Sequence, residues 1–196
     1  MDKFRNKYRI SSTRLQKWDY GWNASYFITI CTKNREYFFG EIVKTPNPGI
    51  ATIAMQLTEI GYIAHKFWDE IPNHFPFVQL GAFVVMPNHV HGIIIIDKQD
   101  DQRNVIKNIA TNVGTRHCLV STPGQKRFQN QGKNTLSSIV GSYKSVVTKH
   151  ARKIHADFAW QSRFHDHIIR DDESYQRIRN YIINNPQNWK NDKFFW

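Results

Sequence analysis

The stretch VVMPNHVHGIIII, residues 84–96, is the best core-forming segment of the chain, yet three polar side chains lie in its middle. Its apolar run predicts two strands, residues 77–86 and 89–97, joined by a turn at MPN. Residues i and i+2 of a strand point to the same face, so His89 and His91 present two imidazoles side by side, while Val90 points the other way.

The paired imidazoles suit two adjacent ligand positions of a metal site. The alternative is a pair of hydrogen-bonded or half-exposed histidines that bind nothing. A second pair with the same spacing, His165 and His167 in FHDHII, would be a rival zinc site, a pair that contacts the substrate, or a coincidence. Four histidines on two strands would also suit a zinc tetrahedron, and spacing alone leaves these interpretations open.

Further strands and helices can be predicted outward from this hairpin. Residues 25–32 and 162–170 have the composition of strands, and a turn with a second, short strand occupies residues 34–42. Apolar side chains recur at helical spacing in residues 54–71 and 135–154, and Pro72 would end the first of these helices. A last helix, residues 173–185, would be capped by Asp171 and Asp172 and ended by Pro186.

This order of elements predicts an α+β fold of the ferredoxin-like, split βαβ type. We expect an antiparallel sheet with helices on one face, an N-terminal hairpin and a C-terminal helix that bears a tyrosine. Residues 1–24 would form a basic N-terminal arm, and residues 25–196 one domain with a polar insertion at about 98–134. A loop of that length is usually either functional or without fixed structure.

The charge of the chain favours a polyanionic partner. Lys and Arg outnumber Asp and Glu by 27 to 16, the formal net charge is +11, and 14% of the residues are aromatic. Cations suit phosphates and aromatic rings suit base stacking, although basic proteins without a nucleic-acid partner are also common. Cys31 and Cys118 form no CxxC pair and suggest a cytoplasmic protein, and no signal peptide or membrane span is indicated.

The last helix carries a second candidate group. In RNYIINNP, Tyr181 and Asn185 are four residues apart and therefore share one helical face. A phenol one turn from an amide oxygen suits a metal-assisted attack on a phosphodiester, with the tyrosine oxygen as nucleophile. The alternative is that Tyr181 is a core residue of an amphipathic helix, like Ile178 and Ile182.

Several segments together carry a family resemblance. MPNHVHGIII, residues 86–95, resembles the His-hydrophobic-His signature of the HUH endonucleases. Residues 26–40 (YFITICTKNREYFFG), 141–151 (GSYKSVVTKHA) and 160–189 (WQSRFHDHIIRDDESYQRIRNYIINNPQNW) are together similar to the single-tyrosine transposases of the REP-associated type. The resemblance covers residues 14–189 and is weakest in residues 98–134. The occurrence of HVH, then WQ…H-IIR, then Y-I-x-x-N-P in that order is specific, whereas each motif alone is not.

The resemblance implies a site and a reaction. His89, His91 and Asn185 would hold a divalent metal, Mg²⁺ or Mn²⁺, Tyr181 would be the nucleophile, and His167 would support the site. The implied reaction cleaves and rejoins single-stranded DNA through a 5′-phosphotyrosine, on short palindromes that fold as hairpins. No nucleotide cofactor would be needed, and the chain has no GxxxxGK[ST] motif.

The remaining partner predictions concern DNA contacts and assembly. We expect no membrane partner and either a monomer or a homodimer. Cations that would contact DNA phosphates are Arg14, Lys144, Lys149, Arg152, Arg163, Arg170 and Arg177.

Two other functions stay open at this stage. A non-catalytic, ferredoxin-like nucleic-acid-binding module would have the basic surface but would not need the His, Tyr and Asn set. A zinc-dependent hydrolase would use the histidines with water as nucleophile, and Tyr181 would be dispensable. Tyr143 and Tyr175 are the competing tyrosines. Tyr143 has only Ile139 and Val147 a turn away, which cannot bind a metal, and Tyr175 is rotated well off the face of Tyr181 at about 100° per residue.

Overall fold

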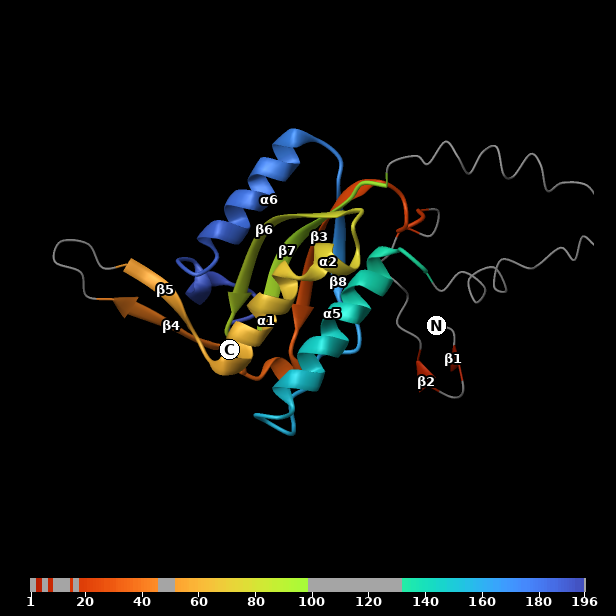
Figure 1. The fold of residues 1–196 in the computed structure, drawn as a ribbon. Coiled ribbons are helices and arrows are strands. Elements are labelled where there is room, and N and C mark those ends of the chain that lie inside the picture. Colours follow the sequence, from red (N-terminus) through yellow and green to blue (C-terminus); the bar gives the residue numbers. More distant parts are fainter. Residues whose placement is uncertain are drawn as a thin grey trace, which may run out of the picture.

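A four-stranded antiparallel sheet with the strand order β6-β7-β3-β8 forms the centre of the molecule (Figure 1). Its strands are β3 (Ala24–Cys31), β6 (Val78–Met86), β7 (His89–Ile96) and β8 (His165–Ile169). The computed structural model describes residues 15, 18–45, 52–98 and 132–195, together with the backbone of strands β1 (Lys3–Phe4) and β2 (Lys7–Tyr8). The predicted α+β class is confirmed.

Strand β7 is a central strand whose two faces are both covered. It pairs with β6 through a tight turn, with Met86 opposite His89, and with β3 on its other side. Ile93 packs in a cluster with Ile182 of the last helix, whereas Ile94 belongs to the main core on the opposite face. A strand buried on both faces needs no polar alternation, which explains the unbroken isoleucine run.

Helices cover the two faces unequally. Helices α1 (Glu59–Asp69) and α5 (Leu136–Ala151) lie on the face of the main core, and the Tyr143 hydroxyl of α5 donates to the Ala64 carbonyl of α1 at 3.0 Å. Helix α6 (Asp172–Asn184) lies on the opposite face, as Figure 1 shows. The two helices of the ferredoxin-like unit therefore share a face, and the added C-terminal helix occupies the other.

The predicted helix over residues 54–71 begins too early. Residues 54–57 belong to β5 (Thr52–Leu57), which pairs with β4 (Gly40–Thr45) in a hairpin beside the sheet. The Thr58 hydroxyl accepts a hydrogen bond from the Gly61 amide and so caps α1 at its true start. Pro72 also does not end this helix, because α1 stops at Asp69 and Pro72 lies in the first turn of α2 (Ile71–His74). The boundary between β5 and α1 is set by the pairing of β5 with β4, and the periodicity of side chains carries no information on that pairing.

The last helix has the predicted boundaries to within a residue. The Asp171 carboxylate accepts from the Ser174 amide at 2.7 Å and caps α6, and Asn185 follows its last residue, directly before Pro186. The chain then turns through η2 (Trp189–Asn191) and brings Phe194 back to the sheet. Trp189 and Phe194 of this C-terminal segment both pack near the start of β7, so the segment lies over the histidine pair.

Some predictions fall outside the described residues. The polar insertion at about 98–134 is described only at its two ends, and most of the basic arm, including Arg14, is not described. Within the described part of the chain, no helix is both long and apolar enough to cross a membrane.

Candidate metal and tyrosine site

His89 and His91 lie side by side on the α6 face of β7, and both are buried. The Nδ1 atom of His89 lies 2.8 Å from Asn88 Oδ1, and the Nδ1 atom of His91 lies 2.8 Å from Thr29 Oγ1. An amide oxygen only accepts, so His89 Nδ1 carries the proton and its Nε2 keeps a lone pair. Such a hydrogen bond is the usual way in which a protein orients an imidazole that binds a metal.

The electrostatic surroundings keep both rings neutral. Burial, helped by the nearby charges of Lys193 and Arg35, lowers the pKa of His89 to about 3. Burial also holds the pKa of His91 well below its ordinary value, and His89 lowers it further. A neutral imidazole has a lone pair to donate, whereas a protonated one has none, so this environment suits ligand binding.

Helix α6 brings Tyr181 to His91, and its C-cap residue Asn185 contacts Asp192, which also contacts Tyr181. Tyr181 Oη lies 3.3 Å from His91 Nε2, and the tyrosine is 42% exposed. Asn185 is buried, and its amide nitrogen donates to the Asp192 carboxylate at 2.9 Å. The nucleophile candidate is thus open to solvent while its neighbours are shielded.

Asp192 is a site residue that the sequence did not reveal. Its Oδ2 atom accepts from Tyr181 Oη at 3.2 Å and from Asn185 Nδ2, and its Oδ1 atom accepts from the Phe194 amide at 2.8 Å. The one available signal was that Asp192 is the only acidic residue after Glu173. Periodicity gave no reason to select it, because it lies in an irregular segment that reaches the site only through the tertiary fold.

Two buried atoms in the site have no hydrogen-bond partner among the described residues. They are His89 Nε2 and Asn185 Oδ1. Buried polar atoms are nearly always satisfied, so two orphan acceptors in one place call for an external donor or a cation. The coordinating atoms of His89, His91 and Asp192 also lie within 4.8 Å of one another. Imidazole, amide and carboxylate donors fit a divalent metal.

Aromatic side chains of the C-terminal segment cover the histidines. The Phe194 ring lies 4.6 Å from the His89 ring between centroids, and the Trp189 ring lies 5.9 Å from it. The Asn88 amide, which orients His89, also donates to the Phe194 carbonyl at 2.9 Å. This cover explains why rings on a sheet face have almost no exposed surface.

The chemical state of Tyr181 follows from the same neighbours. Burial of the ring and the negative charge of Asp192 raise the pKa of Tyr181 to about 12. The phenol is therefore protonated at neutral pH and must lose its proton as it attacks. The Asp192 carboxylate, which already accepts its hydrogen bond, is the nearest described base.

The competing tyrosines are placed elsewhere. Tyr143 is buried between α1 and α5, and burial raises its pKa far above the ordinary value. Tyr175 packs beside Gly81 of β6 in the cluster under α6. Of these three tyrosines, Tyr181 is the one whose hydroxyl lies within hydrogen-bonding distance of the histidine pair.

The second histidine pair faces the same side of the sheet but is separated from the first. His165 and His167 stand opposite Thr29 and Phe27 of β3, and β3 lies between β8 and β7. Within residues 18–45, 52–98 and 132–195, the only group of three or more His, Cys, Asp and Glu side chains close enough to share an ion is His89, His91 and Asp192. A four-histidine zinc site is therefore not formed there.

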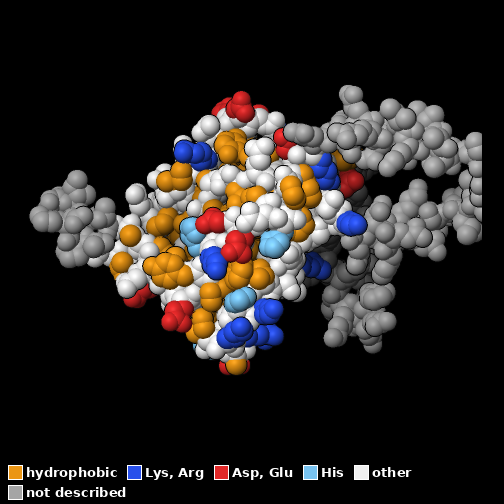
Figure 2. Space-filling view, in the orientation of Figure 1, with side chains coloured by type: hydrophobic (Ala, Val, Ile, Leu, Met, Phe, Trp, Pro, Cys, Tyr) orange, Lys and Arg blue, Asp and Glu red, His pale blue; other side chains and the backbone are white. Residues whose placement is uncertain are grey.

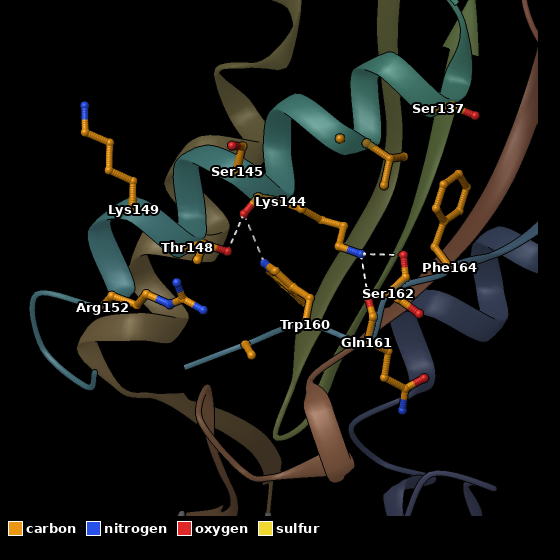
Figure 3. A pocket seen from close by; sticks show the side chains of 13 residues that line it. Ser137, Lys144, Ser145, Thr148, Lys149, Arg152, Trp160, Gln161, Ser162 and Phe164 are labelled. Carbon is orange, nitrogen blue, oxygen red and sulfur yellow. Dashed lines mark hydrogen bonds between the residues drawn. The ribbon is translucent and has the colours of Figure 1, made fainter. Parts of the chain in front are cut away.

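The cations predicted to contact DNA fall into separate places. Helix α5 and its C-cap carry one set, and Figure 2 shows Lys and Arg side chains gathered over the C-terminal end of that helix. A second set lines a cavity of about 450 Å³ beside the start of α6, together with His167. The first set is Lys144, Lys149 and Arg152, which line a cavity beside α5 (Figure 3), and the second is Arg170 and Arg177. Arg163, which lies between the two sets in the sequence, is exposed and lines neither cavity.

Comparison with known proteins bears on the fold and the family of the chain. No family model matches the chain. A solved structure, of the REP-associated tyrosine transposase bound to a REP hairpin, has a TM-score of 0.54 and 19% identity and covers 92% of this chain and 74% of that one. A Haemophilus influenzae protein named "Putative REP-associated tyrosine transposase" is 24% identical over 113 residues, 58% of this chain and 51% of that protein. This likeness shows that the chain has the fold of the REP-associated tyrosine transposase structure, which is the fold that the sequence motifs predicted.

A relative of higher sequence identity shows the family. An uncharacterised protein of Haemophilus influenzae is 37% identical over 185 residues, which is 94% of this chain and 92% of that protein. The chain belongs to the same family as this protein.

Proposed function

We propose that the chain is a metal-dependent transposase that cleaves and rejoins single-stranded DNA through a 5′-phosphotyrosine at Tyr181. The observation that carries the proposal is the position of Tyr181 Oη, 3.3 Å from His91 Nε2 and beside two buried acceptors that lack partners. An exposed phenol next to an N and O ligand set is the arrangement that metal-assisted phosphodiester cleavage requires.

His89, His91 and Asn185 would hold the metal, Mg²⁺ or Mn²⁺, through the lone pairs of His89 Nε2, His91 Nε2 and Asn185 Oδ1. Once bound, the ion supplies Lewis-acid polarisation of the scissile phosphate. Asn88 and Thr29 fix the two rings from behind, so the ligand atoms need no rearrangement.

The reaction forms a bond between Tyr181 Oη and phosphorus and breaks the bond from phosphorus to the 3′-oxygen. Asp192 accepts the phenolic proton through the hydrogen bond that it already makes, and the leaving 3′-oxygen takes up a proton from solvent. His167, which faces the same side of the sheet from β8, is the proposed supporting residue. A 3′-hydroxyl end then attacks the phosphotyrosine and reverses these steps. The bond energy is conserved, so no nucleotide cofactor takes part.

The substrate class follows from charge and from the known relative. Arg170 and Arg177 line the cavity at the start of α6 together with His167, Asp166 and Asp171, and the full chain carries a formal net charge of +11. The solved relative is bound to a REP hairpin. We infer that the substrate is single-stranded or hairpin DNA.

A denaturation-resistant protein–DNA adduct tests the proposal. Wild-type protein with Mn²⁺ and a labelled hairpin oligonucleotide carrying single-stranded flanks should give a covalent band on a denaturing gel. Tyr181→Phe should lose that band completely while keeping its DNA affinity within about twofold, because the phenyl ring retains the packing against Phe27 and His91.

Tyr175→Phe is the matched control and should keep the adduct. Its hydroxyl lies near Gly81 rather than near the histidines. Mass spectrometry of the wild-type adduct should find the nucleotide on the peptide that contains Tyr181. A nucleotide on any other tyrosine would contradict the assignment.

A zinc-dependent hydrolase is the second candidate, and one observation favours it. Two histidines and one aspartate with ligand atoms within 4.8 Å are a donor set that zinc enzymes also use, with water in the open position. The same gel separates the two functions. A hydrolase would cleave DNA without forming an adduct and would retain cleavage in Tyr181→Phe.

A further inference from the structure

Helix α6 rests on the sheet along a narrow stripe of side chains. Tyr175, Ile178 and Ile182 share this stripe and pack against the isoleucines of β7 that face the helix. Tyr181 is one position before Ile182, which at about 100° per residue puts it on the flank of the helix, where it is 42% exposed. The distance from the Tyr181 phenol to His91 therefore depends on where the whole helix lies on the sheet.

Strand β6, an edge strand of the sheet, has an irregular point beneath this stripe. Its register against β7 shifts between Leu80 and Phe83. Gly81 and Ala82 therefore stand together opposite the single residue Ile93. An extra residue of this kind is a β-bulge, which bends a strand and is common beside active sites, where it redirects side chains.

Gly81 leaves a notch at the bulge, between Ile93 and the hydroxyl end of Tyr175. A Cβ atom at Gly81 would lie 2.9 Å from Tyr175 Oη and 2.9 Å from Ile93 Cβ. Contacts this short force a shift of the neighbouring atoms, so the close approach of Tyr175 requires a glycine here. Glycine weakens the interior of a strand, and a bulge that another group approaches closely is a usual reason for its presence.

The other contacts of α6 do not tie it to one point along β6. Ile178 and Ile182 make apolar contacts, which are not directional and so set the distance from the sheet better than the position along it. Asp171 caps α6 from its own first turn. Asn185 donates to Asp192, which belongs to the C-terminal segment and not to the sheet. The contact of Tyr175 with the notch has the shape that these contacts lack.

We propose that Tyr175 is a positioning residue, whose ring in the Gly81 notch holds α6 where Tyr181 Oη meets His91. The inference rests on the proposed function, in which Tyr181 is the nucleophile. Tyr175 touches no reacting atom, because its hydroxyl lies beside Gly81, and it acts through the helix that carries both tyrosines. A misplacement of reacting groups by about 1 Å can cost about a hundredfold in rate, so a residue that fixes the helix affects the reaction without contacting the substrate.

Replacement of the ring tests the proposal from the helix side. With saturating hairpin DNA and Mn²⁺, Tyr175→Leu should form the covalent adduct at least about tenfold more slowly than wild type, because leucine is apolar but too short to reach the notch. Its Kd for DNA should stay within about twofold, which separates positioning from substrate binding. Tyr175→Phe keeps the ring and should keep the rate within about threefold.

A variant of the main core controls for lost stability. Ile28→Val removes a buried methyl group on the face of the sheet opposite α6, so it should lower the stability of the fold and keep the rate of adduct formation.

Gly81→Ala tests the notch from the strand side. Its methyl meets both Tyr175 Oη and Ile93, so the variant should be less stable and at least about tenfold slower. When Gly81→Ala is combined with Tyr175→Phe, the contact with Ile93 remains but the hydroxyl is gone. The rate should then return to within about threefold of Tyr175→Phe, while the stability stays low. A contact that only supported the fold would not give a rescue of rate without a rescue of stability.

Fluorine NMR gives a measurement that needs no catalysis. In metal-free protein whose Tyr181 ring carries one fluorine atom, Tyr175→Leu and Gly81→Ala should move the signal toward that of the unfolded chain, and the double variant should move it back. A wild-type rate or a wild-type signal in Tyr175→Leu would overturn the proposal, and so would equal losses from Gly81→Ala with and without the Tyr175 hydroxyl. An absent adduct in wild-type protein would contradict the catalytic proposal alone, because the fluorine signals would still decide the role of Tyr175.

Discussion

His89 and His91 show that one hydrogen bond at Nδ1 orients a buried imidazole and leaves its Nε2 facing the site. Asn88 and Thr29 occupy the inner nitrogen of each ring, and burial lowers the pKa of both. The pattern HxH predicted two rings on one face, and the structure adds that both are neutral and oriented. The sequence did not predict Asp192, because a residue in an irregular return segment carries no periodic signal.

The buried histidines predict a dependence of stability on pH. In the unfolded chain an imidazole titrates near pH 6.5, whereas in the folded protein the pKa of His89 is about 3. Between these values the unfolded chain binds a proton that the native protein does not. Stability is therefore complete above about pH 6.5 and should fall below it, by up to about 1.4 kcal/mol per pH unit for each such histidine.

Urea unfolding in EDTA at pH 7.5 and pH 5.5 measures this effect. His89→Gln should flatten the dependence on pH, and His74→Gln, at an exposed histidine, should keep it. Equal free energies of unfolding of the wild type at the two pH values would contradict the expectation.

At the scale of strands and helices, the central sheet and the helices were predictable from the sequence, whereas the first residue of α1 was not. The spacing of apolar residues placed the start of the first predicted helix inside β5, because residues 54–57 fit a helical pattern as well as a strand pattern. Pairing with β4, the preceding strand of the hairpin, involves residues outside the stretch whose periodicity was counted, so the helical pattern of residues 54–71 does not reveal it. The last helix was predicted well because its Asp cap and its Pro stop are both local signals.

Two glycines predict opposite effects on stability. A Cβ on Gly92 of β7 would collide with the Trp68 ring, which stacks on Phe83 at 4.3 Å between centroids. Gly92→Ala should therefore lower the free energy of unfolding by about 1–3 kcal/mol. Gly141→Ala, where the added methyl meets open space, should raise it by about 0.5–1 kcal/mol. Thermal unfolding of both variants checks the prediction, and a stable Gly92→Ala would show that Trp68 can move freely.

At the scale of the whole molecule, the net charge of +11 should attract DNA electrostatically before any contact forms. Phosphate contacts release counterions, so log Kd for hairpin DNA should rise steeply and linearly with log salt. We also expect hairpin DNA with single-stranded flanks to bind more tightly than blunt duplex of equal length, because only a flexible strand can reach Tyr181 between α6 and the sheet. Competition in anisotropy experiments measures both, and equal affinity for blunt duplex would contradict the assigned substrate.

The unbroken run of four isoleucines in β7 makes the unfolded chain prone to aggregation. In the native sheet its backbone is paired on both sides, by β6 and β3, and its side chains are covered on both faces. Released from that position, residues 93–96 are an uncharged, β-branched segment of the kind that starts intermolecular aggregation. Native-state hydrogen exchange should find their amides among the slowest of the protein, and refolding yield should fall as the protein concentration rises. Mutations that loosen either neighbouring strand would thus act first on solubility in the cell.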